Sequence, residues 1–392
     1  MKVLIVGAGL YGAVCAHELT RRGHRCTVLD KREHIGGHAY TRYHAEVRCH
    51  EYVYGAPAFH TDAKPIWDYV NRFAEFRPYE YRVKVAHGGH RYSFPINLMT
   101  LHQVFGTCTP RDAHARLAAE RIPCAAPETL EQACLATLGP TLYGLFIEGY
   151  TVKQWGRHPA QLPAAFVARL PVRLSFDDRY VSDRYQGLPL DGYTPMIAQM
   201  LAGSDVHLGI DFLYRRDDWL KRYPRVIYTG PIDAFFDERF GPLAYRTLRL
   251  EREVLPMADF QGAPVVHYTE STVPYTRIIE HKHFDAAGAG AAAGAASTAL
   301  PEAVPAGSPG ASAGAPASER TLITRVYLHA REPGQAPDYP VNDAWNALLL
   351  QRYRHAAESL AGHVHFGGRL AEYRDDRMHQ VIRAALAFCA RA

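Results

Sequence analysis

The sequence feature that most constrains the fold is a glycine-rich turn close to the start of the chain. Gly7, Gly9 and Gly12 stand between a short apolar, β-branched run at 3–6 and a segment with helical spacing at 10–22. In this setting the first glycine permits a tight turn, the second lets the backbone approach a pyrophosphate, and the third lets the helix pack closely on the strand. The free N–H groups of the helix then face the anion. The turn therefore predicts a dinucleotide-binding site.

The residues after this helix extend the pattern. A second strand is predicted at 26–29, and it ends at Asp30, which is placed to accept hydrogen bonds from ribose hydroxyls. Gly36 and Gly37 follow soon after, where the chain can pass close to a cofactor. This continuation resembles the large group of FAD proteins built like amine oxidases, so a flavin is favoured over a nicotinamide.

Composition narrows the class of protein further. The 392 residues are enough for two or three domains, and 47% hydrophobic with 21% charged residues is typical of a globular protein. A net charge of +4 is too small to indicate nucleic acid or an anionic membrane as a partner. The seven cysteines include no Cys-x-x-Cys pair, which predicts neither a disulfide framework nor a metal site. No apolar stretch approaches the ~20 residues that span a bilayer, and a cytoplasmic protein without membrane insertion is expected.

Several later segments carry clear secondary-structure signals. Residues 109–155 read as helices with a break at Gly139–Pro140, and a C-terminal helix is predicted at 378–391. Residues 164–195 read as a mobile loop followed by strands. Further strands are predicted at 226–229, 246–251 and 263–268. In 286–318, Ala, Gly, Pro and Ser make up 29 of 33 residues, so this insertion is expected to be disordered.

Longer motifs make the resemblance specific. They are Gly-Tyr-Thr-Val-Lys-Gln-Trp-Gly-Arg at 149–157, Ser-Asp-Arg-Tyr-Gln-Gly at 182–187, Pro-Tyr-Thr-Arg-Ile-Ile-Glu-His-Lys at 274–282, Tyr-Pro-Val-Asn at 339–342 and Gly-Gly-Arg-Leu-Ala-Glu-Tyr at 367–373. With these motifs in this order, the chain resembles the bacterial UDP-galactopyranose mutases over nearly its whole length, apart from the insertion.

The resemblance implies an α/β fold in which an FAD-binding Rossmann-like domain carries an inserted helical subdomain and an antiparallel β-sheet domain. The expected FAD domain is discontinuous, made of 1–80, 196–240 and 340–392. The expected helical substrate subdomain, with its mobile loop, is 97–170. The expected sheet domain is 81–96, 171–195 and 241–339, with the disordered insertion inside it.

The function that the resemblance implies is interconversion of UDP-galactopyranose and UDP-galactofuranose without net redox change. In that family the FAD must be reduced, and its N5 acts as the nucleophile while UDP leaves. The implied partners are these two nucleotide sugars, and a homodimer is considered. Two alternatives remain open: a degenerate protein that binds FAD and a UDP-sugar without turnover, and an FAD oxidoreductase of the amine-oxidase type.

Matching the family's motifs assigns site residues one by one. Arg169 and Arg277 are expected at the diphosphate, as the catalytic arginines. Tyr150 matches a residue that stacks on uracil, Trp155 one that lines the sugar site, and Asn97 a polar group near the substrate. The other expected substrate residues are Phe146, Tyr180, Arg246, Tyr339 and Tyr373. The expected cofactor residues are Gly7, Gly9, Tyr11, Gly12, Asp30, Lys31, Gly37, His38, Pro57, Ala58, Arg369, Asp376 and Met378.

Three positions depart from the family pattern at the flavin end. The family's His in its Gly-Ala-x-x-Phe-His-Thr loop is Pro57 here, its Asn after Gly-Gly is His38, and its Asp before Met-His-Gln is Arg377. One hypothesis is that Asp376 replaces the missing carboxylate and Arg377 turns to solvent. The other is that flavin affinity or activity is impaired.

Overall fold

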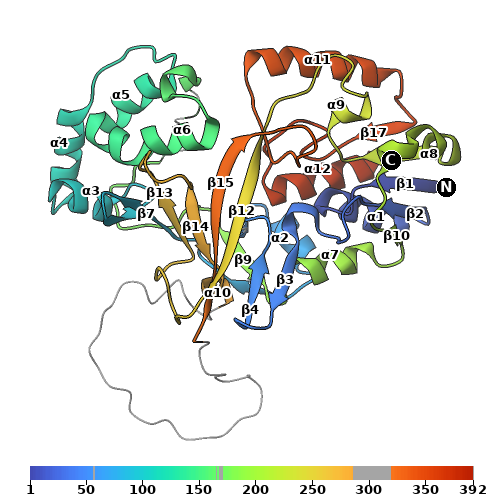
Figure 1. Ribbon diagram of the computed structural model, residues 1–392, viewed down its shortest axis with the longest axis horizontal. Helices are drawn as coiled ribbons and strands as arrows, with labels where there is room; N and C mark the ends of the chain where they lie inside the picture. The colour runs from blue at the N-terminus through green and yellow to red at the C-terminus, as the bar shows by residue number, and fades with distance from the viewer. Residues whose placement is uncertain (56–57, 165, 167–170, 286–318, 392) are drawn as a thin grey trace, which may run out of the picture.

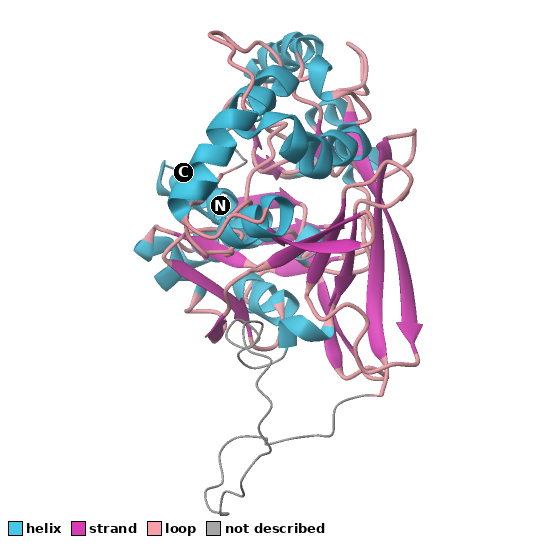
Figure 2. Ribbon diagram, turned by 90° about the vertical axis from the view of Figure 1, so that its left-hand side faces the viewer, coloured by secondary structure: helices cyan, strands magenta, loops and turns pink. Residues whose placement is uncertain are grey.

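The computed structural model describes residues 1–55, 58–164, 166, 171–285 and 319–391. A parallel sheet and a larger, mostly antiparallel sheet lie side by side, and a group of helices lies beyond the far edge of the larger sheet (Figure 1). In the turned view of Figure 2 the long antiparallel strands run down one side of the molecule. The predictions that fall on 56–57, 165, 167–170 and 286–318, which include part of the mobile loop and the whole insertion, lie outside the described residues.

The parallel sheet draws its strands from widely separated parts of the chain. Its order is β10 (Asp205–His207), β2 (Arg25–Leu29), β1 (Lys2–Val6), β11 (Arg225–Tyr228) and β17 (Val364–Phe366). Val3 and Ile5 belong to the core shared with α1, whereas Leu4 belongs to the core on the opposite face. Because both faces are covered, the strand is apolar at successive positions rather than alternating.

Three helices cover one face of this sheet. They are α1 (Leu10–Arg21), which follows the glycine turn, α7 (Tyr193–Leu201) and α12 (Met378–Arg391), and α1 packs against the other two. The opposite face is covered by the short helices η5 (Phe212–Arg215), α8 (Arg216–Arg222) and α9 (Ile232–Phe235). The strands and helix predicted in the first thirty residues, the strand near 226 and the C-terminal helix are all confirmed.

The larger sheet has seven strands. Its order is β16 (Tyr339–Pro340), β12 (Tyr245–Leu255), β15 (Thr321–Ala330), β14 (Arg277–Glu280), β13 (Val265–Tyr268), β7 (Val83–His87) and β8 (His90–Phe94). All neighbouring pairs are antiparallel except β13 and β7, which run parallel with Val266 opposite Lys84. The sheet therefore differs at one pair from the wholly antiparallel sheet that was expected.

Two small sheets complete the strands. One pairs β3 (Thr41–His44) with β4 (Cys49–Tyr52), and the other has the order β5 (Phe59–Thr61), β9 (Tyr185–Pro189) and β6 (Phe76–Pro78). β9 was expected with the antiparallel sheet domain, but it pairs with strands of the N-terminal segment. Gly187 permits this pairing, because a Cβ there would lie 2.6 Å from the carbonyl oxygen of Arg77.

The helical group has its own apolar core. It contains α3 (Leu98–Phe105), α4 (Pro110–Glu120), α5 (Leu130–Leu142), the π-helical turn η2 (Tyr143–Glu148) and α6 (Gly149–Trp155). Gly139 has a φ of 78° inside α5, so the predicted break at Gly139–Pro140 is confirmed. Elsewhere the chain forms η1 (Gly37–Ala39), α2 (Lys64–Val70), η3 (Pro159–Gln161), α10 (Lys282–Asp285) and α11 (Ala344–Glu358).

The described part of the chain has no helix that is both long and apolar enough to cross a membrane.

Candidate functional site

A cavity of ≈ 910 Å³ extends from the glycine turn of the parallel sheet to the aromatic side chains of α6 and the larger sheet. Its lining includes Gly7, Gly9 and Gly12 at one end and Tyr150 and Tyr180 at the other. The cavity thus joins the predicted cofactor residues to the predicted substrate residues.

Backbone packing explains the glycines of the turn. Gly7 has a φ of 113°, and a Cβ there would lie 2.0 Å from Oγ1 of Thr229. A Cβ on Gly12 would lie 2.0 Å from the carbonyl oxygen of Gly7. Gly37 approaches Gly9 so closely that a Cβ on Gly37 would lie 3.1 Å from the Cα of Gly9. The turn and the Gly36–Gly37 pair therefore form a wall of bare backbone, which suits a pyrophosphate.

Asp30 supports the same turn. Its two carboxylate oxygens accept hydrogen bonds from the N–H groups of Ala8 at 2.8 Å and Arg32 at 2.9 Å. The side chain is buried and lines the cavity, as does the neighbouring Lys31. A carboxylate has about four acceptor positions, so Asp30 keeps capacity for ribose hydroxyls after making both backbone bonds.

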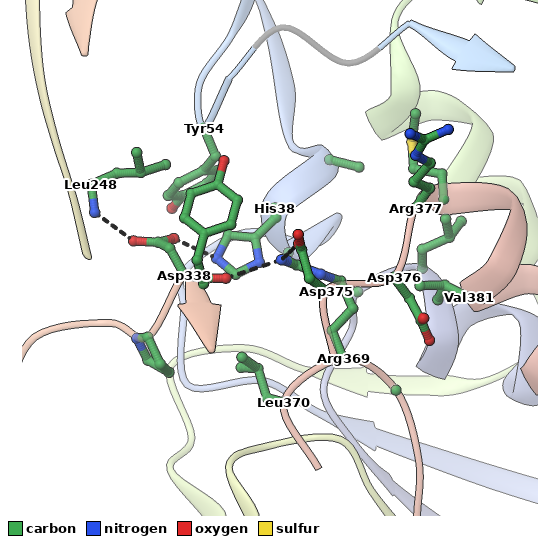
Figure 3. Close-up of a pocket in the computed structure, with 18 of the residues that line it drawn as sticks. His38, Tyr54, Leu248, Asp338, Arg369, Leu370, Asp375, Asp376, Arg377 and Val381 are labelled. Atoms are coloured by element: carbon green, nitrogen blue, oxygen red, sulfur yellow. Dashed lines mark hydrogen bonds and ion pairs between the residues drawn. The ribbon is translucent and has the colours of Figure 1, made fainter. Parts of the chain in front are cut away.

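His38 faces a carboxylate across the cavity wall (Figure 3). Its Nε2 lies 3.0 Å from Oδ1 of Asp338, and Oδ2 of Asp338 accepts the N–H of Leu248 at 2.8 Å. Burial lowers the pKa of His38, and Asp338 offsets only part of that effect. His38 is therefore a neutral imidazole at neutral pH, held beside the carboxyl group of Asp338.

Arg369 lies next to this pair. Its Nη2 donates to the carbonyl oxygen of Asp338 at 3.0 Å and to Oδ1 of Asp375 at 3.3 Å. Its Nε is buried and has no hydrogen-bond partner within the described residues. A buried, unpartnered guanidinium N–H in a cofactor cavity is the kind of donor that a bound ligand satisfies.

The two residues at the third departure point in different directions (Figure 3). Asp376 is nearly buried and lies 3.1 Å from Nε of Arg374, whereas Arg377 is exposed. Both line the cavity, together with Met378 and Ala58. The exposure of Arg377 agrees with the hypothesis that it turns to solvent, and a role for Asp376 at the flavin stays a prediction. Pro57 lies outside the described residues.

Tyr11 lines the cavity, but its hydroxyl is already engaged. The hydroxyl oxygen lies 2.8 Å from Nε2 of His365. Its ring packs against Gly367 and Gly368, where a Cβ would lie 2.3 Å and 3.2 Å from Tyr11 atoms. Tyr11 therefore shapes the wall of the cavity through its ring, its hydroxyl already has one partner in His365, and its role in cofactor binding stays a prediction.

Aromatic side chains form the other end of the cavity. Phe146, Tyr150 and Trp155 reach it from η2 and α6, and Tyr180 and Tyr339 reach it from two other segments. Phe146 also packs edge-on against Tyr92, with ring centroids 5.4 Å apart, so it belongs to the core of the helical group as well.

His267 is a cavity residue that the sequence did not single out. Its ring lies between Tyr150, at 5.3 Å, and Tyr180, at 6.3 Å. Burial, with a smaller contribution from the charge of Arg277, lowers the pKa of His267 to about 3. The imidazole is therefore neutral at physiological pH. The sequence did not identify His267 as a cavity residue, because a strand pattern such as 263–268 does not show which of its side chains faces a cavity.

Arg277 lies on β14, directly opposite His267 of β13. It does not itself line the cavity, but its guanidinium interacts with the phenols of Tyr150 and Tyr339, which do. Tyr81 is a third phenol beside it. No carboxylate among the described residues forms an ion pair with Arg277. A partly buried cation without a counterion, ringed by phenols, is suited to an anionic ligand.

Three predicted substrate residues do not line the cavity. Arg246 donates to the carbonyl oxygens of Gln154 at 3.1 Å and of Lys153 at 3.2 Å, at the end of α6. The hydroxyl of Tyr373 is engaged with the backbone of Ala244 and Val341. These bonds hold the elements around the cavity in place. Arg169, the second predicted catalytic arginine, lies outside the described residues.

Asn97 is the third of these residues, and it caps a helix. Its Oδ1 accepts the N–H groups of Met99 at 2.8 Å and Thr100 at 3.2 Å, and its Nδ2 donates to Ser93 and Pro95. The side chain is fully buried. The sequence shows the capping pattern Asn-x-x-Thr directly before the apolar helix, which is the signal that would have identified this role.

Replacing Asn97 with Ala is expected to lower the free energy of unfolding by about 1–3 kcal/mol, because a helix cap and two buried hydrogen bonds are lost. The KM for substrate should stay within twofold of the wild-type value, roughly the scatter expected when no substrate contact changes. Thermal unfolding and steady-state kinetics check this result. A large rise in KM without loss of stability would contradict the capping role.

The fold and the cavity together define a Rossmann-type dinucleotide-binding protein with a second, substrate-side region. In agreement, residues 5–73 match the model of an NAD(P)-binding Rossmann-like domain. Residues 145–309 and 312–375 match the model of the UDP-galactopyranose mutase domain. The chain belongs to the UDP-galactopyranose mutase family, whose members are FAD-dependent isomerases.

Relatives support the same conclusion. The chain is 37% identical to a probable UDP-galactopyranose mutase of Klebsiella pneumoniae over 98% of this chain and 92% of that protein. It is also 37% identical to a dTDP-fucopyranose mutase of Escherichia coli, over 72% of this chain and 77% of that protein. A crystal structure of reduced UDP-galactopyranose mutase has a similar fold, with a TM-score of 0.66 at 13% identity, covering 100% of this chain and 96% of that chain.

Proposed function

We propose that this protein interconverts UDP-galactopyranose and UDP-galactofuranose with bound, reduced FAD. The observation that carries the proposal is the cavity itself. It joins a bare-backbone dinucleotide turn to an aromatic end where Arg277 has no carboxylate partner among the described residues. The similarity to a probable UDP-galactopyranose mutase over nearly the whole chain supports this substrate.

The residues present fit FAD. A Cβ on Gly12 would collide with the carbonyl oxygen of Gly7, so only glycine lets α1 start this close to the turn, where its N–H groups would face a pyrophosphate. Asp30 would hold the ribose, and the buried Nε of Arg369 would gain a partner. When reduced and bound, the flavin would supply the nucleophile of the reaction.

The aromatic end would hold the nucleotide sugar. Tyr150 would stack on the uracil, and Tyr180 and Tyr339 would donate hydrogen bonds to the diphosphate. Arg277 would neutralise the negative charge that develops on the diphosphate as it leaves. A preorganised cation acts most strongly there because the surrounding phenol rings exclude water.

An absorbance spectrum and an exchange assay test the proposal together. The purified protein should be yellow, and after dithionite reduction it should convert UDP-galactofuranose to UDP-galactopyranose with no net consumption of reductant. A colourless protein that takes up no FAD would contradict it. Binding of UDP without exchange would instead support the degenerate binding protein, and consumption of an oxidant would support the oxidoreductase.

The similarity to a dTDP-fucopyranose mutase suggests a second candidate substrate, dTDP-fucopyranose. dTDP-fucopyranose lacks the sugar's 6-hydroxyl and the ribose 2′-hydroxyl, and its base carries an extra methyl group. We expect the reduced enzyme to prefer UDP-galactofuranose over dTDP-fucofuranose by at least about tenfold in kcat/KM, the effect of one lost hydrogen bond. A preference in the opposite direction would reassign the substrate while leaving the reaction unchanged.

Two further expectations stay predictions. They are a location in the cytoplasm and assembly as a homodimer.

A further inference from the structure

Lys153 makes an unusual set of contacts in the helix that carries Tyr150. Its Nζ donates to four carbonyl oxygens, those of Tyr268 at 2.6 Å, Glu270 at 2.7 Å, Val273 at 3.0 Å and Tyr275 at 3.1 Å. Tyr268 is the last residue of β13, and the other three belong to the connection between β13 and β14. No carboxylate in the described part of the chain lies within ion-pair distance of Lys153, so these carbonyl oxygens are the direct partners of its ammonium group.

The connection that Lys153 holds, residues 269–276, links β13, which carries His267, to Arg277 at the start of β14. The connection is not part of a β-sheet. Only Thr269 and Thr276 form backbone hydrogen bonds to neighbouring strands. An ammonium ion has three protons, so four converging carbonyl oxygens surround it much as they would surround a bound cation. Lys153 therefore replaces, within this loop, the backbone bonds that a sheet would provide.

Gly149 provides a second contact between the same helix and the same loop. A Cβ on Gly149 would lie 2.3 Å from the carbonyl oxygen of Thr269 and 3.2 Å from the backbone nitrogen of Ser271. Gly149 and Lys153 are four residues apart, so they lie on one face of α6. The helix thus meets the loop without a gap, and Lys153 ties the two together.

Tyr150 and Arg277 stand on the two sides of this junction. Tyr150 belongs to α6, one residue after Gly149, and Arg277 directly follows the loop. The positive charge of Arg277 acts on the phenol of Tyr150, which lines the end of the cavity. At the C-terminal end of α6, Arg246 of β12 donates to the carbonyl oxygens of Lys153 and Gln154. A shift of the loop relative to α6 would change the gap between phenol and guanidinium.

We propose that Lys153 is a positioning residue that fixes the gap between Tyr150 and Arg277 in which the UDP group binds. Lys153 does not line the cavity, so it acts through these two residues. This inference rests on the proposed function, because it takes Tyr150 and Arg277 to be the groups that hold UDP.

The matched variants are Lys153→Met, which removes the charge but keeps the length, and Lys221→Met, which makes the same change on exposed α8. Lys153→Met is expected to raise the KM for UDP-galactofuranose and the Kd for UDP by about 10- to 100-fold, with a smaller change in kcat and unchanged FAD content. Lys221→Met should match the wild type. Equal KM and Kd values in Lys153→Met and the wild type would overturn the proposal, and so would loss of FAD.

The pH dependence of UDP binding separates positioning from a general loss of stability. Burial lowers the pKa of Lys153 to about 8, and the charge of Glu270 opposes this shift. Tyr268 and Tyr275 meet the ammonium through their carbonyl oxygens, and Arg246 bonds to the backbone carbonyl of Lys153. Since the folded protein releases this proton as the pH rises through about 8, wild-type affinity for UDP should fall there.

Lys153→Arg keeps its charge at every pH used, so its UDP affinity should lack that fall, whatever its absolute value. The same fall in Lys153→Arg and in the wild type would overturn the proposal, even if Lys153→Met does not fold. Alkylating Lys153→Cys with 2-bromoethylamine restores an ammonium group and should recover most of the lost affinity. Treated wild-type protein controls for the other cysteines, and absence of recovery would count against the proposal.

The outcomes also distinguish the two proposals. If Arg277→Ala binds UDP as the wild type does, the proposed site is wrong. If Arg277→Ala loses UDP while Lys153→Met binds it normally, the site stands and only the positioning role of Lys153 fails.

Discussion

Replacing Arg277 with Ala is expected to lower kcat/KM with UDP-galactofuranose by roughly 10²- to 10³-fold, the typical effect of removing one preorganised group at a developing charge. The bound FAD should be retained, because Arg277 contacts the phenols of the substrate end and not the glycine turn. Steady-state kinetics of the reduced enzyme, together with the flavin absorbance per protein, measure both effects.

Arg325→Ala is the matched control. Arg325 lies on the neighbouring strand β15, but its guanidinium already pairs with Glu253. The Arg325→Ala change removes the same charge from the same sheet but alters no residue that lines the cavity. Turnover should therefore remain near the wild-type value. Equal losses in both variants would show that net charge matters and that Arg277 has no special role.

The second large effect is expected from Gly12→Ala. The new Cβ would lie 2.0 Å from the carbonyl oxygen of Gly7, which is backbone and cannot rotate away. The turn must shift, and the resulting strain should weaken FAD binding by roughly 10- to 100-fold. The protein should therefore be isolated with little colour, and titration with FAD should give the Kd directly.

Gly144→Ala is the control that shows whether replacing a glycine outside the turn also weakens FAD binding. A Cβ on Gly144 meets no atom within 4 Å, and the residue lies in the helical turn η2. Its FAD content should equal that of the wild type, and its stability should change by less than ~1 kcal/mol. A normal Kd for FAD in Gly12→Ala would show that the turn does not approach the cofactor.

The dinucleotide half of the site could be predicted from the sequence because its signals are local. Gly7, Gly9, Gly12 and Asp30 lie within one βαβ unit, so their spacing alone determines that they meet. The same is true of the break at Gly139–Pro140, where two adjacent residues that disfavour helix mark the kink.

Other parts of the site depend on contacts between distant segments. His267 reaches the cavity only because β13 pairs with both β7 and β14, and a strand pattern does not specify its neighbours. Arg246 was expected at the substrate, but its guanidinium bonds to the end of α6. The sequence pattern could not show these bonds, because the partners of Arg246 lie about 90 residues away in the sequence.

The strands of the parallel sheet come from distant parts of the chain, and this affects when the protein can bind its cofactor during synthesis. The glycine turn leaves the ribosome before the other four strands of the sheet, whereas β17 and α12, which complete the sheet and supply Met378 to the cavity, follow only after residues 1–363. Closing such long-range pairs is slow, and the apolar strands 3–6 and 26–29 stay uncovered meanwhile. A nascent chain stalled before residue 364 should therefore carry a complete nucleotide fingerprint and still hold no flavin.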